Sequence, residues 1–157
     1  MGAGSGKTTV GRTLAKELNW IFYDADDFHA PESIEKMAKS IPLTDKDREP
    51  WLQRIAEQIE IWREFNVVLA CSALKAMYRR QLDNRTCEVH WVYLQGCREL
   101  LLNRISQRQN HFMSNRLLES QLDTLEEPDR NKALWVNIDP SPEEIASTIE
   151  NWLHQQS

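Results

Sequence analysis

The opening residues, MGAGSGKTT, constrain the fold more than any other part of the sequence. Three glycines precede a lysine and a threonine, and an apolar pattern of helical period follows through Val10, Leu14 and Leu18. Glycines allow successive backbone N–H groups to turn inward around phosphate oxygens, where side chains would block the approach. The N-terminus of the helix adds a favourable dipole for an anion. This stretch therefore predicts a phosphate-binding loop that runs into a helix.

The loop resembles the Walker A pattern G-x-x-x-x-G-K-[ST], with one departure. Counting back from Lys7, the first glycine of the pattern falls on Met1, so that Gly2 stands one place late. In this interpretation Lys7 neutralises the β- and γ-phosphates and Thr8 is a ligand of a magnesium ion. The predicted nucleotide contacts are the loop and the first turn of the helix: Gly2, Ala3, Gly4, Ser5, Gly6, Lys7, Thr8 and Thr9.

Short apolar segments alternate with helical patterns along the rest of the chain. Strands are predicted at residues 20–23, 67–71, 89–94 and 133–138. Helices are predicted up to about Glu17, at 31–39, from Asp47 to about Trp62, around 100–105, from Ser114, and at 142–154. This alternation predicts an α/β fold with a parallel sheet that helices cover on both faces. A chain of 157 residues is most simply a single domain, residues 1–157.

Composition excludes several classes of protein. The formal net charge of -5 argues against a general affinity for nucleic acid or anionic membranes. No apolar run approaches the ~20 residues of a membrane span, and no secretory leader opens the sequence. The three cysteines, Cys71, Cys87 and Cys97, have neither paired nor zinc-like spacing. We therefore expect a cytoplasmic protein with reduced thiols.

An acidic segment, Asp24-Ala25-Asp26-Asp27, follows the first predicted strand. In open α/β sheets, ligands bind at the carboxyl ends of the strands. Phosphoryl transfer to a hydroxyl group needs one carboxylate near the acceptor and another near the metal. Because alternate residues of a strand share a face, we expect Asp24 and Asp26 on the same side. The alternative interpretation is an acidic turn that caps the next helix.

Further segments make the sequence similar to a known family. They are YDADDFH (23–29), EKMAKSIPLTDKDREPWL (35–52), LACSALKAMYR (69–79), NHFM (110–113) and QLDTLEEP (121–128). In this order, which spans nearly the whole chain, they resemble the gluconate kinases (gluconokinases) of the shikimate-kinase-like P-loop group. One departure is Asn110, which stands where the family usually has a glycine.

The resemblance implies a fold and a reaction. The fold is the three-layer P-loop kinase fold, a five-stranded parallel sheet in the order 2-3-1-4-5 with flanking helices and a small lid, here at about residues 108–128. The reaction transfers the γ-phosphoryl group of ATP to the 6-hydroxyl of D-gluconate, with Mg²⁺, and feeds gluconate catabolism. Family members commonly dimerise, which leaves a homodimer open.

The resemblance also implies roles for individual residues. Asp24 is the metal-side carboxylate, acting through water, and Asp26 orients the acceptor hydroxyl or takes its proton. Arg104 and Arg108 stabilise charge on the moving phosphoryl group, and Asp139-Pro140 lies where backbone groups hold the adenine. Cations and hydrogen-bonding groups suit a sugar acid. The implied substrate contacts are Asp26, His29, Arg48, Ser72, Lys75, Arg79 and His111, for several of which a solvated surface charge is the alternative.

The central strand of the family's sheet has no counterpart in this sequence, because no apolar residues precede the phosphate loop. We therefore expect four strands, with the gap between the second and third. Two explanations stay open: a chain shortened at its N-terminus, or a kinase whose catalysis has lapsed. The intact polar residues elsewhere favour shortening.

Two other functions compete with gluconate phosphorylation. One is a related kinase that acts on shikimate or a nucleoside monophosphate, and the other is a nucleotide-binding protein without turnover. The segment at residues 35–52 favours the gluconate family over the first of these.

Overall fold

The computed structural model describes residues 6–83, 88–107 and 115–156. Its strands are β1 (Ile21–Asp24), β2 (Val67–Ala70), β3 (Trp91–Gln95) and β4 (Ala133–Asn137). Its helices are α1 (Lys7–Leu18), the 3-10 helix η1 (Ala25–Phe28), α2 (Pro31–Ala38), α3 (Asp45–Trp62), α4 (Ala76–Leu82), α5 (Arg98–Gln107), α6 (Asn115–Thr124) and α7 (Pro142–Gln156). The alternation confirms the predicted α/β fold, while η1 and α4 are additions to the predicted elements.

The strands form two separate parallel pairs. β1 pairs with β2, with Ile21 opposite Val67, and β3 pairs with β4, with Trp91 opposite Ala133. Within the described part of the chain, no strand lies between β2 and β3. This order confirms the expected gap between the second and third strands.

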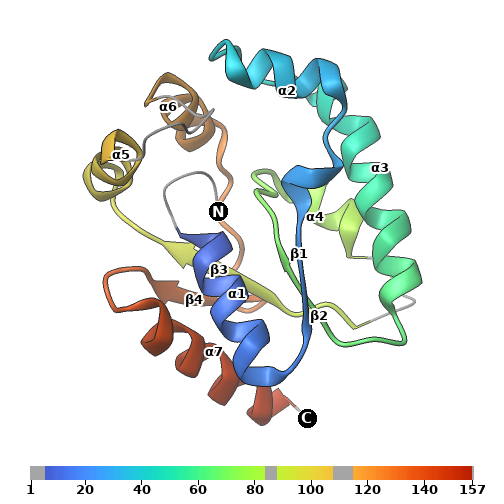
Figure 1. The fold of residues 1–157 in the computed structure, drawn as a ribbon, viewed down its shortest axis with the longest axis vertical. Coiled ribbons are helices and arrows are strands. Elements are labelled where there is room, and N and C mark those ends of the chain that lie inside the picture. Colours follow the sequence, from blue (N-terminus) through green and yellow to red (C-terminus); the bar gives the residue numbers. More distant parts are fainter. Residues whose placement is uncertain (1–5, 84–87, 108–114, 157) are drawn as a thin grey trace.

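Helix α1 links the two strand pairs through its packing. It packs against β1, β2 and α7, and α7 in turn packs against β4 (Figure 1). Its buried residues Val10 and Leu14 share one apolar cluster with Leu94 of β3 and Val136 of β4, against which Val68 of β2 also packs. A continuous apolar core therefore joins the halves of the sheet.

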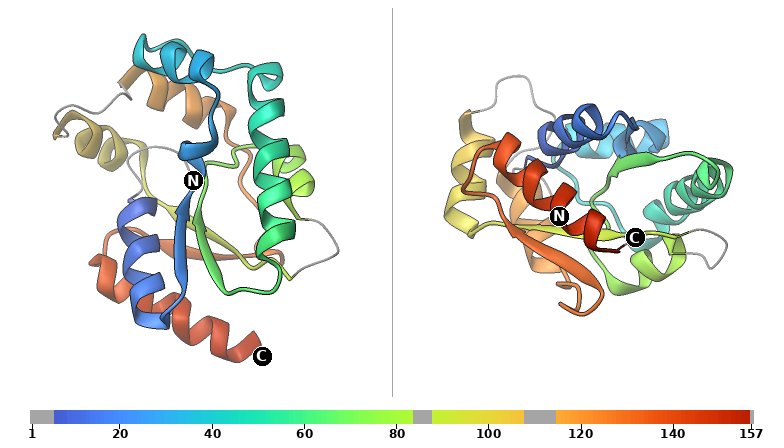
Figure 2. Two further views of the ribbon diagram at one scale, coloured as in Figure 1. Left: turned by 45° about the vertical axis from the view of Figure 1, so that its right-hand side comes forward. Right: turned by 90° about the horizontal axis from the view of Figure 1, so that it is seen from below.

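The remaining helices complete the layers around the strands. α3 stands on the side of β1 and β2 away from α1, as both Figure 1 and the left view of Figure 2 show. α2, α5 and α6 lie beyond the carboxyl ends of the strands (Figure 1). A second apolar cluster, centred on Trp51, Leu52 and Ile55 of α3 with Tyr78 of α4, fills the space beside β2. This arrangement leaves the carboxyl ends of the strands as the floor of a site.

Among the helices that the structure describes, none combines the length and the apolar character needed to cross a membrane.

Candidate active site

The phosphate side of the site begins at Gly6, which precedes helix α1. Gly6 has a φ of +80°, a left-handed conformation that favours glycine, so the sequence can turn sharply into the helix here. Lys7 is the first helical residue, as the loop prediction requires. The other predicted loop residues, Gly2, Ala3, Gly4 and Ser5, lie outside the described residues.

Arg104 of α5 lies beside the start of α1. A Cβ atom placed on Gly6 would be 3.6 Å from Nη1 of Arg104. Nη2 of Arg104 donates a hydrogen bond to the carbonyl of Ile138 at 3.1 Å, directly before Asp139 and Pro140. The structure therefore brings together Gly6, Arg104 and the predicted adenine segment. Arg108 lies outside the described residues.

A short chain of hydrogen bonds joins α1 to the acidic segment. Thr8 Oγ1 donates to Asp24 Oδ2 at 3.0 Å, and Asp24 Oδ1 accepts from the backbone N–H of Asp26 at 3.0 Å. β1 ends at Asp24, and Asp26 belongs to η1, so the strand-alternation argument for their common side is wrong. A turn capped by Asp24 sets their positions, which is the alternative interpretation of this segment.

The donor set of Thr8 and Asp24 fits Mg²⁺, which prefers hard oxygen ligands and keeps several waters. No group of three or more His, Cys, Asp or Glu residues able to hold a metal occurs in the described ranges. A magnesium ion here would therefore depend on phosphate oxygens and water for most of its ligands, and the contact of Asp24 through water stays a prediction.

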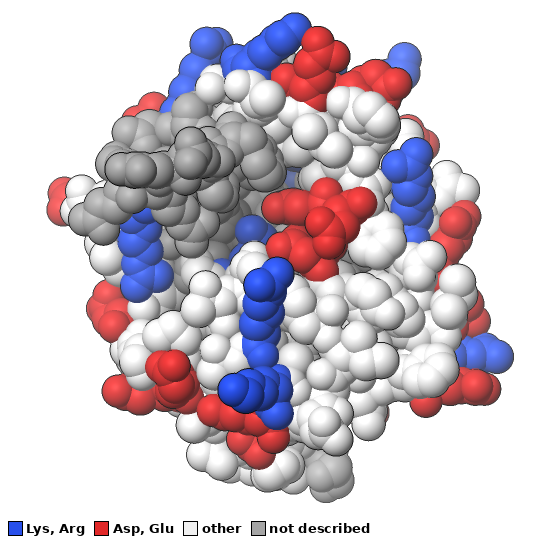
Figure 3. Space-filling view, in the orientation of Figure 1, with Lys and Arg blue, Asp and Glu red and all other residues white. Residues whose placement is uncertain are grey.

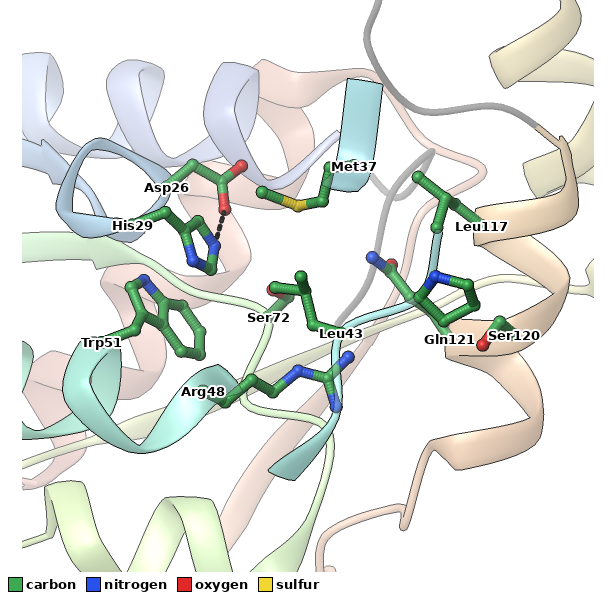
Figure 4. A pocket seen from close by; sticks show the side chains of 11 residues that line it. Asp26, His29, Met37, Leu43, Arg48, Trp51, Ser72, Leu117, Ser120 and Gln121 are labelled. Carbon is green, nitrogen blue, oxygen red and sulfur yellow. Dashed lines mark ion pairs between the residues drawn. The ribbon is translucent and has the colours of Figure 1, made fainter. Parts of the chain in front are cut away.

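Beside Asp26 lies a hollow that opens to solvent, which we call the acceptor pocket (Figure 4). Four predicted substrate contacts line it: Asp26, His29, Arg48 and Ser72. The other lining residues come from α2, α3, α6 and the segment between α2 and α3: Met37, Pro42, Leu43, Trp51, Leu117, Ser120 and Gln121. Acidic side chains gather next to this region, over η1 in Figure 3.

Trp51 holds one wall of the acceptor pocket in place. Its ring stacks on His29 with centroids 4.5 Å apart, and its Nε1 donates to the carbonyl of Ala25 at 2.7 Å. His29 Nε2 lies 3.5 Å from Asp26 Oδ1, and its buried Nδ1 has no hydrogen-bond partner in the described structure. Trp51 is thus part of the core and also supports the pocket.

Two predicted substrate contacts lie elsewhere. Lys75 is paired with Asp45, with Nζ 2.9 Å from Oδ1, and is not part of the pocket lining. Arg79 donates to the carbonyls of Ala73 and Glu126 at 2.8 and 2.6 Å. It lines a different hollow, so its predicted direct contact with the substrate is not supported by its position. His111 lies outside the described residues.

Cys71 lines that second hollow too. Burial raises the pKa of its thiol to about 12, which keeps it protonated and agrees with the predicted packing role.

Helix α6 supplies pocket residues that the sequence interpretation did not single out. Ser120 and Gln121 of α6 line the acceptor pocket, and Gln121 is the first residue of the QLDTLEEP segment. That segment was the available signal, but no spacing within it indicates which residue faces the pocket.

Comparison with known proteins identifies the class. A family model described as shikimate kinase matches residues 3–154, nearly the whole chain. A probable gluconokinase of Xenopus tropicalis is 42% identical over 94% of this chain and 87% of its own. The described fold and site thus define a small-molecule kinase with a P-loop.

Solved structures agree with the sequence comparison. A sugar kinase from Janibacter sp. superposes with a TM-score of 0.86 at 38% identity, covering 96% of this chain and 89% of its own. A gluconokinase from Sinorhizobium meliloti gives a TM-score of 0.83 at 36% identity, covering 99% and 93%. The chain belongs to the gluconokinase family.

Proposed function

We propose that this protein transfers the γ-phosphoryl group of ATP to the 6-hydroxyl of D-gluconate, with Mg²⁺. The observation that supports this most directly is the path from Thr8 through Asp24 to Asp26. It joins the helix behind the phosphate loop to the backbone of Asp26, the residue whose side chain lines the acceptor pocket. Phosphoryl transfer requires such a junction, because donor and acceptor oxygens must be held in line.

The chain's own residues divide the work of this reaction. Lys7 neutralises phosphate charge, and Arg104 stabilises the charge that spreads over the moving phosphoryl group. Asp26 orients the acceptor hydroxyl and takes its proton, while Arg48 receives the carboxylate at the other end of the acceptor. Mg²⁺, when bound near Thr8 and Asp24, would neutralise charge on the β- and γ-phosphates.

Gluconate suits the acceptor pocket because the pocket combines one cation with several hydrogen-bonding groups. Arg48 supplies the positive charge, and Ser72, Gln121 and His29 supply polar atoms for hydroxyl groups. Shikimate also carries a carboxylate, so the cation alone does not separate the two acids. A cytoplasmic location stays a prediction from the composition, and a homodimer stays a prediction from the resemblance.

The test is ADP release by the purified 157-residue chain with ATP, Mg²⁺ and one acceptor at a time: D-gluconate, shikimate, a nucleoside monophosphate or D-glucose. We expect turnover that depends on gluconate. Preferential turnover of another acceptor would contradict the proposed substrate. ATP binding by a folded sample without transfer to any acceptor would favour the nucleotide-binding alternative.

A further inference from the structure

Arg48 is a buried cation that forms no direct ion pair with another residue of the described structure. It is 8% exposed, and no ion pair in the described part of the chain includes it. Its Nη1 donates instead to the phenol oxygen of Tyr78 at 3.0 Å, and its guanidinium carbon lies 5.5 Å from the centre of that ring. A buried charge without an ionic partner is costly, so this guanidinium is suited to receive an anion.

The hydroxyl of Tyr78 lies between Arg48 and the carboxylate of Asp45 and is hydrogen-bonded to both. Tyr78 is 2% exposed, on α4, and its hydroxyl donates to Oδ1 of Asp45 at the start of α3. A phenol has a single proton to donate. Because that proton is directed to Asp45, a lone pair of the phenol oxygen is left to accept from Arg48. The hydrogen bond to Asp45 thus fixes the hydroxyl in the orientation that holds the guanidinium.

Asp45 in turn has its own cation. Lys75 Nζ donates to Oδ1 and Oδ2 of Asp45 at 2.9 and 3.1 Å. The hydrogen bond from Lys75 is the largest cause that lowers the pKa of Asp45, and the bond from Tyr78 is the next. The bond to Asp45 likewise raises the pKa of Lys75. Asp45 and Lys75 are therefore both charged near neutral pH and neutralise each other, so that the charge of Arg48 remains available.

We propose that Tyr78 is a positioning residue that sets Arg48 for the carboxylate of the acceptor, and that Lys75 acts by neutralising Asp45 without touching the acceptor. This inference rests on the proposed function, because it takes the acceptor to be an acid. It adds three residues that determine specificity by positioning Arg48: Asp45, Lys75 and Tyr78. None of them lines the acceptor pocket. It also gives Lys75 a role that its position outside the pocket allows.

The first test compares Tyr78→Phe with Tyr93→Phe. Tyr93 is a matched control, since it is also buried and its hydroxyl also bonds a carboxylate, Glu127 at 3.1 Å, but beside the second hollow. A hydrogen bond to a charged group corresponds to roughly 10- to 100-fold in affinity. We expect Tyr78→Phe to raise KM for gluconate by about that factor, with KM for ATP unchanged. An unchanged KM for gluconate, or an equal rise for ATP, would overturn the proposal.

A double-mutant cycle separates positioning from general loosening of the fold. In an Arg48→Met background, Tyr78→Phe should raise KM for gluconate no further, because the group on which it acts is gone. A rise of equal size in both backgrounds would mean that Tyr78 acts through the fold, and would reject the positioning role.

The role of Lys75 has a test of its own. Lys75→Met leaves Asp45 uncompensated and should raise KM for gluconate a few-fold. Adding Asp45→Asn should reverse that rise, since asparagine still accepts from the Tyr78 hydroxyl but carries no charge. If the double variant stays as poor as Lys75→Met, then Lys75 contacts the acceptor directly and the proposed role is wrong.

A readout without turnover keeps the inference separate from the proposed function. The guanidinium ¹H–¹⁵N signals of Arg48, assigned with Arg48→Lys, should exchange slowly with water in the parent chain and rapidly in Tyr78→Phe. Equal exchange in both would contradict the positioning role even if gluconate is turned over. An inactive parent chain with the expected NMR difference would instead contradict the proposed function alone.

Discussion

The phosphate side and the acceptor side of the site use different kinds of residue to hold their functional groups. On the phosphate side, the described contacts use a backbone turn at Gly6 and small or flexible side chains, Thr8, Asp24 and Arg104. On the acceptor side, large buried rings do the positioning, with Trp51 under His29 and Tyr78 under Arg48. The difference teaches where each function resides in the sequence. In the proposed function, phosphate binding would depend on the backbone turn at Gly6, whereas acceptor choice would depend on side chains brought together from distant segments.

Removal of the Lys7 charge should give the largest effect and should spare the acceptor side. We expect Lys7→Ala to lower kcat/KM by about 10³-fold or more, because a cation on the transferring phosphates contributes chiefly in the transition state. Gluconate binding, measured by calorimetry, should persist. Lys16→Ala, on the exposed last turn of the same helix, is the control and should keep full activity. Near-normal turnover of Lys7→Ala would refute the phosphate-loop assignment.

Asp26 lies where the two sides meet, so its loss should damage transfer and not nucleotide binding. We expect Asp26→Asn to reduce kcat by roughly 10²- to 10⁴-fold, the range for loss of a positioned proton acceptor. The dissociation constant of ATP should stay within about twofold, since the backbone N–H of Asp26, and not its carboxylate, bonds Asp24.

The neighbouring Asp27→Asn serves as the control for this prediction, because Asp27 is exposed and lies outside the lining of the acceptor pocket. If Asp26→Asn and Asp27→Asn transfer phosphate equally well, Asp26 has no part in the chemistry.

The contrast between the two sides also explains what the sequence could reveal. All four strands are predicted at nearly their observed positions, because short runs such as Val67–Ala70 have an apolar, β-branched character that few helices share. Gly6 and Lys7 were identifiable for a similar reason, since a glycine loop encodes its chemistry in consecutive residues. Local structure of this kind needs no knowledge of distant contacts.

The contacts on the acceptor side could not be predicted without the fold. Arg48 and Arg79 look equivalent as sequence, yet Arg48 reaches the pocket and Arg79 bonds the carbonyl of Glu126, 47 positions away. Tyr78 occurs in α4, a helix of 7 residues that is too short to display a clear period. No pattern along the chain indicates that its hydroxyl lies between Asp45 and Arg48, because both partners come from α3.

Trp51 tests whether the acceptor side depends on rings held by hydrogen bonds. Trp51→Phe removes the buried hydrogen bond from Nε1 to the carbonyl of Ala25, which costs about 0.5–1.5 kcal/mol in the free energy of unfolding. KM for gluconate should rise with it, because the smaller phenylalanine ring, no longer held by the bond to Ala25, supports His29 less firmly than the indole does. Urea unfolding measures the stability. Trp62→Phe is the matched control, since Trp62 stacks on Tyr23 at 4.4 Å and lies outside the acceptor pocket. A smaller loss of stability in Trp51→Phe than in Trp62→Phe would contradict this account.

The smallest expected effect concerns how α2, one wall of the acceptor pocket, is held to α3. Lys36 Nζ bonds both carboxylate oxygens of Asp47 at 3.0 and 2.9 Å, and Asp47 also accepts from the N–H of Thr44 in a capping box. The bond from Thr44, followed by that from Lys36, lowers the pKa of Asp47 from 3.8 to about 2. Since the folded-state pKa is depressed, the carboxylate stabilises the fold above pH 3.8, and this contribution is lost as the pH falls towards 2.

Asp47→Asn should therefore lower Tm by a few degrees at pH 7, and the difference from the parent chain should shrink between about pH 4 and pH 2. Glu49→Gln, an exposed carboxylate on the same helix, should show no such pH-dependent difference. Because the phosphate side is anchored by α1 and not by α2, the Asp47 variant should alter KM for gluconate more than KM for ATP. A loss of stability that is the same at pH 7 and pH 2.5 would mean that the charge of Asp47 does not hold this wall, and that the shape of the acceptor pocket is set by packing alone.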